Sequence, residues 1–160
     1  MPEAYVALGS NLDDPRAQVE RGFDALAALP HTALRARSRL YRTRPWGVTE
    51  QPDFVNAVAS LETALAPRDL LDALLLIESR AGRRRDIRWG PRTLDLDLLL
   101  YGNAELHEPG LDIPHPRLHE RSFVLMPLAD LAPDLEVPEQ GRVADLLARV
   151  DNAGCVPIVD

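Results

Sequence analysis

The sequence of 160 residues predicts an α+β fold of the ferredoxin-like type, an antiparallel sheet backed by helices. Two observations support this prediction. Apolar residues recur with strand and helix periods in the order strand, helix, strand, strand, helix, strand, which is the order of a split β-α-β unit. The length matches one ordinary domain, so we expect residues 1–160 to form a single domain. Two further apolar segments, 121–131 and 143–150, predict extra C-terminal helices.

The first strand and the first helix have the clearest signals. Residues 4–8 form a short apolar run closed by residues 9–11, which predicts a buried strand ending in a tight turn. Asp14 and Pro15 then supply a helix cap and a first helical residue. Apolar positions at helical spacing continue the helix until Pro30.

Two alternating segments predict the next two strands. Over 34–43 apolar residues alternate with arginines, which predicts one half-exposed strand. Over 54–63 an apolar face alternates with a face that carries Phe54 and Asn56, and this pair suits stacking of a flat ring and pairing with its polar edge. The loop 44–53 contains a tryptophan that either anchors the loop on the core or covers a ligand.

The second predicted helix begins at Pro67 and ends at Gly82. Glu78 continues its apolar stripe, because helical neighbours lie three and four residues apart, so this acid lies where the helix meets the interior. Two interpretations stay open for Glu78. Its carboxylate faces a pocket, or it reaches back to water.

The segment 93–101 is the most strand-like in the chain and carries two acids, Asp95 and Asp97, on one face. Alternation places Leu99 and Tyr101 on the same face and the remaining leucines on the other. The backbones of the two acids are about 6.5–7 Å apart, close enough to hold one cation or two adjacent ones. Like charges this close are costly when buried unless a positive charge compensates them.

The loop 82–92 leads directly into these acids and is rich in arginine. Most basic runs are solvated surface, but this one adjoins the carboxylate pair, and guanidinium groups suit multidentate contact with phosphate. Carboxylate oxygens are ligands for Mg²⁺, the cation that usually bridges nucleotide phosphates. The sequence therefore predicts one site for phosphates and metal.

Beyond this strand no clear pattern is present until His115. Prolines on both sides of His115 restrict the backbone, so a stiff loop presents its imidazole. In the apolar helix that follows, we expect Ser122 to be the N-cap. The other histidines carry no motif and are expected to be structural or on the surface: His31, His107 and His119.

Composition excludes several function classes. The chain has 18 Lys and Arg against 25 Asp and Glu, a net charge of −7, which argues against a general binder of nucleic acid or of membrane surfaces. Its one cysteine, Cys155, allows no internal disulfide and fits a reducing compartment. No signal-peptide pattern or long uncharged apolar stretch is present, so we expect a cytoplasmic protein.

Five motifs together resemble one family, and they occur in the order in which that family carries them. The sequence is similar to the 6-hydroxymethyl-7,8-dihydropterin pyrophosphokinases of folate biosynthesis from about Ala4 to Pro133. The long block around the two acids is far more specific than a short motif. The motifs are Gly9-Ser10-Asn11-Leu12, Tyr41-Arg42-Thr43, Gln51-Pro52-Asp53-Phe54-Val55-Asn56-Ala57, Arg88-Trp89-Gly90-Pro91-Arg92-Thr93-Leu94-Asp95-Leu96-Asp97 and Pro114-His115-Pro116-Arg117.

The resemblance implies transfer of the β,γ-pyrophosphoryl group of ATP to the pterin hydroxymethyl oxygen, giving AMP and the pterin diphosphate. By this match Asp95 and Asp97 are catalytic and hold two Mg²⁺ ions. Arg83 and Arg92 match catalytic arginines that neutralise the phosphates. Positioning and charge neutralisation would carry most of the catalysis. The residues that match the family's ATP site are Glu78, Arg85, Trp89, Arg92, His115 and Arg121.

The resemblance also implies a pterin site and leaves one other class of function to be weighed. The matching substrate-binding residues are Thr43, Pro45, Trp46, Phe54, Asn56 and Phe123, with the two phenylalanines on either side of the ring. The alternative is a ferredoxin-like nucleic-acid-binding module that would use the loop 83–92 on phosphates. The net charge disfavours it, so we expect ATP and a reduced pterin as partners, no nucleic acid, no membrane, and a monomer.

Overall fold

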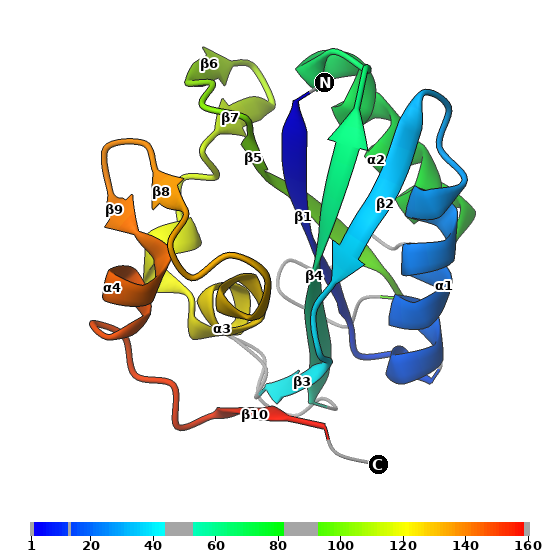
Figure 1. Ribbon diagram of the computed structural model, residues 1–160. Coiled ribbons are helices and arrows are strands. Elements are labelled where there is room, and N and C mark those ends of the chain that lie inside the picture. Colours follow the sequence, from blue (N-terminus) through cyan, green and yellow to red (C-terminus); the bar gives the residue numbers. More distant parts are fainter. Residues whose placement is uncertain (1, 13, 44–52, 82–92, 159–160) are drawn as a thin grey trace.

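The computed structural model describes residues 2–12, 14–43, 53–81 and 93–158. Its helices and strands follow the predicted order and add small elements near the C-terminal end (Figure 1). The helices are α1 (Pro15–Ala27), α2 (Pro67–Arg80), α3 (Ser122–Leu131), α4 (Val143–Leu147) and a 3-10 turn over Leu118–Glu120. The strands are β1 (Glu3–Ser10), β2 (Thr32–Arg37), β3 (Tyr41–Thr43), β4 (Phe54–Thr63), β5 (Asp95–Tyr101), β6 (Leu106–Glu108), β7 (Leu111–Ile113), β8 (Glu136–Val137), β9 (Gly141–Arg142) and β10 (Cys155–Pro157).

The main sheet confirms the predicted fold class. Its strands lie in the order β10, β3, β4, β1, β5, with β2 also paired to β4, and the pairs are antiparallel. The first strand thus lies between the third and fourth strands of the predicted unit, as a split β-α-β arrangement requires. Among the described residues, no helix is both long enough and apolar enough to cross a membrane.

Helices cover both faces of this sheet, with α1 and α2 on one side and α3 and α4 on the other (Figure 1). The predicted faces of β4 are confirmed, because Val55 and Ala57 lie in the core under α1 and α2 while Val58 lies in the core under α3. The predicted cap of α1 is also confirmed, since the Asp14 carboxylate accepts a hydrogen bond from the amide of Ala17 at 3.3 Å.

The prediction of one strand over 34–43 is wrong, because the segment forms β2 and β3 with a break between them. The break lies at Ser38, whose backbone amide donates to the carbonyl of Val58 while its hydroxyl accepts from the amide of Val58. Ser38 thus forms hydrogen bonds with both backbone groups of Val58, and the alternation of arginines along the segment does not reveal the break in the strand.

The predicted alternation of β5 holds only for its first half. A bulge in the pairing between β1 and β5 lies at Tyr5 and Val6. Leu99 and Leu100 therefore both belong to the core under α3, and Tyr101 packs against the opposite core. The bulge lies beyond the two acids, so their shared face is unaffected.

Other corrections concern short elements. The turn expected over 9–11 begins later, because Gly9 and Ser10 still belong to β1 and pair with β4. Ser122 is the first residue of α3 rather than its cap, which is Arg121. The region without a clear pattern contains the hairpin of β6 and β7, and β10 joins the main sheet beside β3. Very short strands bury too few residues to leave an apolar period in the sequence.

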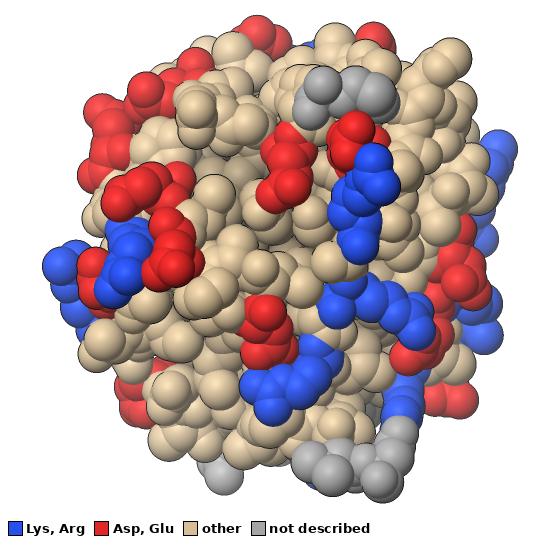
Figure 2. Space-filling model, in the orientation of Figure 1, with Lys and Arg blue, Asp and Glu red and all other residues tan. Residues whose placement is uncertain are grey.

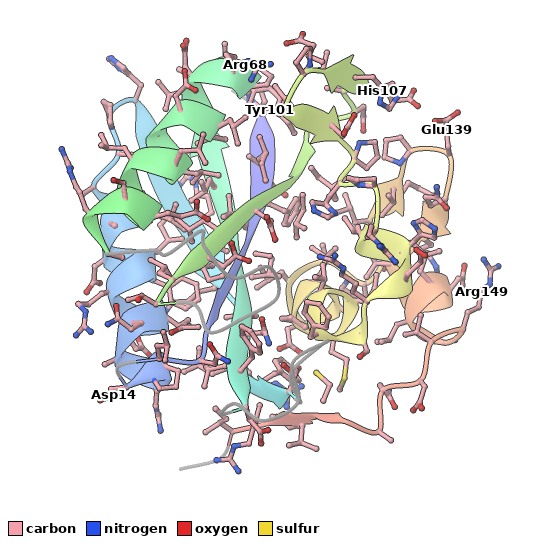
Figure 3. The ribbon with its side chains drawn as sticks, turned by 180° about the vertical axis from the view of Figure 1, so that it is seen from behind. Asp14, Arg68, Tyr101, His107, Glu139 and Arg149 are labelled. Atoms are coloured by element: carbon pink, nitrogen blue, oxygen red, sulfur yellow. The ribbon has the colours of Figure 1, made fainter. Side chains whose placement is uncertain are left out.

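The β6–β7 hairpin marks the end of the molecule remote from the two acids of β5. Seen from behind, Arg68, Tyr101 and His107 lie at this end and Asp14 at the other (Figure 3). The Arg68 guanidinium donates to the Glu108 carboxylate at 3.1 Å and ties the hairpin to α2. The Asp14 end, where β1 stops and β4 and β5 begin, is the end that carries the candidate site.

Candidate functional site

The predicted site residues on strands meet at one end of the sheet. Thr43 ends β3, whereas Phe54 and Asp95 begin β4 and β5. Across the strands, Asp95 pairs with Gly9, and Gly9 pairs with Asn56, so an acid and an amide lie in one lateral row on either side of a glycine. Directly paired residues of antiparallel strands share a face, so this row faces one side of the sheet.

The row and the second acid face the α3 side. Asp97 pairs with Ala7, which packs in the core under α3. Leu94 and Leu96 are buried in the opposite core, while Asp95 and Asp97 are partly exposed, so the predicted shared face of the two acids is confirmed. Partly exposed carboxylates are donors that suit Mg²⁺. Within the described ranges, no group of three or more His, Cys, Asp or Glu side chains is placed to hold a metal ion.

Glu78 is buried beside the strand that carries the acids. It is 1% exposed, and its Oε2 accepts a hydrogen bond of 2.7 Å from the amide of Leu96, the residue between Asp95 and Asp97. Its carboxylate therefore does not reach back to water. The strand β5 ends the described sheet on this side, so half of its amides have no strand partner. Glu78 occupies one of them and holds the backbone between the two acids.

His115 lies between charges of both signs. Its amide donates to the carbonyl of Leu99 at 2.9 Å, which fixes the loop against β5. Burial, together with the nearby charge of Arg121, lowers the pKa of His115 to about 4, while Asp95 acts in the opposite direction. The imidazole is therefore neutral at pH 7, and the structure brings His115 into electrostatic range of both Arg121 and Asp95.

The amide of Asn56 is held in place by Thr43. Asn56 Nδ2 donates to Thr43 Oγ1 at 2.6 Å, and the two residues are 8% and 5% exposed. Phe54 is partly exposed at the start of β4, and Phe123 lies in the first turn of α3, which packs against β4. The Arg121 guanidinium lies 5.6 Å from the centre of the Phe123 ring. Phe54 and the Asn56 amide therefore border the same end of the sheet, and α3 brings Phe123 to the sheet face that carries Asn56.

Several predicted site residues lie outside the described residues, and their roles stay predictions: Pro45, Trp46, Arg83, Arg85, Trp89 and Arg92.

A network around the buried Tyr41, which the sequence did not reveal, supports the amide side of the site. Tyr41 pairs with Asn56 across β3 and β4 and donates to the Asp130 carboxylate of α3 at 2.8 Å. Arg39 donates to the same carboxylate at 3.0 Å, and burial helps raise the pKa of Tyr41 to about 12, so its hydroxyl stays protonated. Asp130 is 89 residues from Tyr41 in the sequence, so no local pattern could connect them.

Comparison with known proteins gives a consistent result. A profile described as 7,8-dihydro-6-hydroxymethylpterin-pyrophosphokinase (HPPK) matches residues 5–133. Two relatives carry the name 2-amino-4-hydroxy-6-hydroxymethyldihydropteridine pyrophosphokinase. The one from Pseudomonas aeruginosa is 57% identical over 144 residues, covering 90% of this chain and 89% of the relative. The one from Haemophilus influenzae is 47% identical over 147 residues, covering 92% of each.

Solved structures agree at the level of the fold. A wild-type Plasmodium falciparum HPPK-DHPS structure with pteroate superposes with a TM-score of 0.73 at 13% identity. The match covers 92% of this chain and 42% of that one, so this chain spans less than half the length of the two-part protein.

Proposed function

Because the chain belongs to the 7,8-dihydro-6-hydroxymethylpterin-pyrophosphokinase family, we propose that the row of Asp95, Gly9 and Asn56 joins the two halves of its active site. The enzyme transfers a pyrophosphoryl group from ATP to the hydroxymethyl group of the dihydropterin, a step of folate biosynthesis. The proposal is based on the strand register that places these three residues side by side. Two strand spacings separate the acid from the amide, about 10 Å at the backbone, so a ring at one and phosphates at the other could share one site.

On the phosphate side, Asp95 and Asp97 would hold magnesium, and we propose two ions. When bound, Mg²⁺ would neutralise phosphate charge and align the reacting oxygens. Arg121 supplies a cation near His115, and the neutral imidazole of His115 can donate a hydrogen bond from Nε2 to phosphate without adding charge, because its Nδ1 accepts from the amide of Arg117.

The remaining phosphate contacts are proposed for the loop before β5. Arg83 and Arg92 would compensate the charge that develops on the phosphates, with Arg85 and Trp89 also at the nucleotide. Glu78 would act differently from the other ATP-site residues. Its bond to the amide of Leu96 supports a role in holding the backbone of the acids rather than in touching the nucleotide.

On the pterin side, Asn56 would read the polar edge of the ring. One N–H of its amide is bound to Thr43, and its oxygen and second N–H can pair with a donor and an acceptor of the pterin. Phe54 and Phe123 would stack on the ring faces, with Pro45 and Trp46 closing the site from the loop after Thr43. A fixed amide lowers the entropy cost of binding.

The reaction products test this function. Purified protein with Mg²⁺, ATP and the reduced pterin alcohol should form AMP and the pterin diphosphate in equal amounts. Formation of ADP, or intact ATP, would overturn the proposal. Asp97→Asn should lower kcat by about a hundredfold or more with the fold retained, because a charge on the phosphate side is lost. Asp72→Asn, on the exposed face of α2, is the control and should leave kcat unchanged.

We also propose that the enzyme acts as a monomer in the cytoplasm. The described site residues lie on neighbouring strands of one sheet and on the helix that packs against it, so one chain can complete the site, and ATP is a cytoplasmic substrate. Acidic and basic side chains are interspersed on the face shown in Figure 2, which disfavours a surface for nucleic acid there. Sedimentation equilibrium at micromolar concentration should give about the mass of one chain, and a larger mass would contradict this part of the proposal.

A further inference from the structure

Gly9 lies at the centre of the active-site row, and position 9 requires glycine because a larger side chain would not fit there. Its φ is outside the left-handed region, so an L residue could adopt the same backbone conformation. A Cβ built on Gly9 would lie 2.8 Å from Asn56 Oδ1, closer than real Cβ atoms approach an oxygen. The next two nearest atoms are Asn56 Cγ and the carbonyl oxygen of Val55, so the three nearest neighbours all belong to β4.

The atom that would meet this Cβ is the movable end of a side chain. The backbone of Gly9 is held by pairing with β4 and β5 on both sides, whereas the Asn56 amide can rotate. Rotation would relieve the contact but would disturb the 2.6 Å bond from Asn56 Nδ2 to Thr43 Oγ1. A side chain at position 9 therefore changes the orientation of the amide before it changes the sheet.

We propose that Gly9 is a positioning residue for pterin binding, because its missing side chain lets the Asn56 amide lie over β1 in the orientation that Thr43 holds. This inference rests on the proposed function, since it takes Asn56 as the group that reads the pterin edge. It assigns Gly9 no contact with the substrate. The glycine acts through Asn56 alone.

The chain offers a matched control for the size of the clash. A Cβ on Gly22 in α1 would lie 2.8 Å from Leu8 Cδ2, the same distance, and would also approach Leu94. This contact lies in the core under α1, on the other face of the sheet from Asn56. Gly22→Ala should therefore overpack that core and lower stability without changing the amide.

The experiment is a calorimetric titration of the pterin alcohol into protein saturated with a non-hydrolysable ATP analogue and Mg²⁺. Gly9→Ala should weaken pterin binding about tenfold, the effect of one lost hydrogen bond. The affinity for the ATP analogue should stay within about twofold of the wild type. Gly22→Ala should keep both affinities within about twofold at a lower melting temperature.

A double-mutant cycle decides whether Gly9 acts through Asn56. On an Asn56→Ala background the amide is absent, so Gly9→Ala should cause no further loss of pterin affinity. The side-chain amide resonances of Asn56, read by NMR without ligand, should shift in Gly9→Ala and stay in place in Gly22→Ala.

Three results would overturn the inference. They are unchanged pterin affinity in Gly9→Ala, an equal loss on the Asn56→Ala background, and unshifted Asn56 resonances. Failure of the proposed function is distinguishable, because then wild-type protein would itself bind no pterin.

Discussion

Replacing Glu78 tests how the acids of β5 are held in place. The bond from the Leu96 amide to Glu78 Oε2 is 2.7 Å long, and both residues are buried, at 4% and 1% exposed. A hydrogen bond to a charged group contributes about 1.5–3 kcal/mol and a neutral one about 0.5–1.5 kcal/mol. Glu78→Gln keeps an acceptor of the same size, so we expect it to lower the free energy of unfolding by about 1–2 kcal/mol.

Glu78→Ala should cost more, because it removes the acceptor, leaves a cavity and buries an unsatisfied amide. We expect a loss of about 3 kcal/mol or more. The assay is urea unfolding combined with hydrogen exchange at the Leu96 amide, which should be protected in the wild type and exchange faster in Glu78→Ala. Asp72→Asn, exposed on the same helix, should change stability by less than about 0.5 kcal/mol.

The effect on catalysis distinguishes a Glu78 that holds the backbone of β5 from a Glu78 that contacts ATP. If Glu78 acts through the backbone, Glu78→Gln should lower kcat modestly, and hydrogen exchange at the Leu96 amide should become faster in the same variant. A Glu78→Ala protein as stable as the wild type, with unchanged protection of Leu96, would show that Glu78 does not hold the backbone of β5. A Glu78→Gln protein more stable than the wild type would do the same, because it would mean that burying the charge outweighs the bond.

Three further predictions concern the site and its support. In the ligand-free protein the His115 ring should titrate near pH 4 by NMR. Because folding lowers its pKa from 6.5, the unfolded chain takes up a proton at a higher pH than the folded protein does, so stability should fall as the pH drops from about 6.5 to about 4. His115→Gln should reduce this dependence of stability on pH. Thr43→Val should weaken pterin binding about tenfold by removing the acceptor for Asn56, and Thr43→Ser should restore it; equal affinity in both variants would contradict the role of the hydroxyl. Asp130→Ala should lower the free energy of unfolding by about 2–3 kcal/mol in urea, because the hydroxyl of Tyr41 loses its acceptor, and a change below about 0.5 kcal/mol would contradict the network.

Local patterns were sufficient for the long elements. The alternation over 54–63 predicted both the bounds and the two faces of β4, because one face carries mainly aliphatic side chains while the other includes Asn56 and Ser60. Spacing alone also placed Asp95 and Asp97 on one face, since the bulge between β1 and β5 lies beyond them. These predictions depend on neighbours along the chain.

Contacts between distant segments could not be predicted in this way. The amide of Leu96 reaches Glu78 from another element, and the split between β2 and β3 depends on Ser38 contacting Val58. The importance of Gly9 likewise depends on which strand lies beside it, because Asn56 is its neighbour only in the folded sheet. The residues suggested a turn there, whereas the pairing places Gly9 between Asp95 and Asn56.

We propose that the acids of β5 and the amide of β4 form one site across Gly9. The most direct test is a crystal structure of the protein with Mg²⁺, a non-hydrolysable ATP analogue and the pterin alcohol. We expect metal density at the carboxylates of Asp95 and Asp97, the polar edge of the pterin on the amide of Asn56, and the hydroxymethyl group directed across Gly9 toward the phosphates. A pterin bound away from Asn56, or phosphates bound without metal at the two acids, would contradict this proposal.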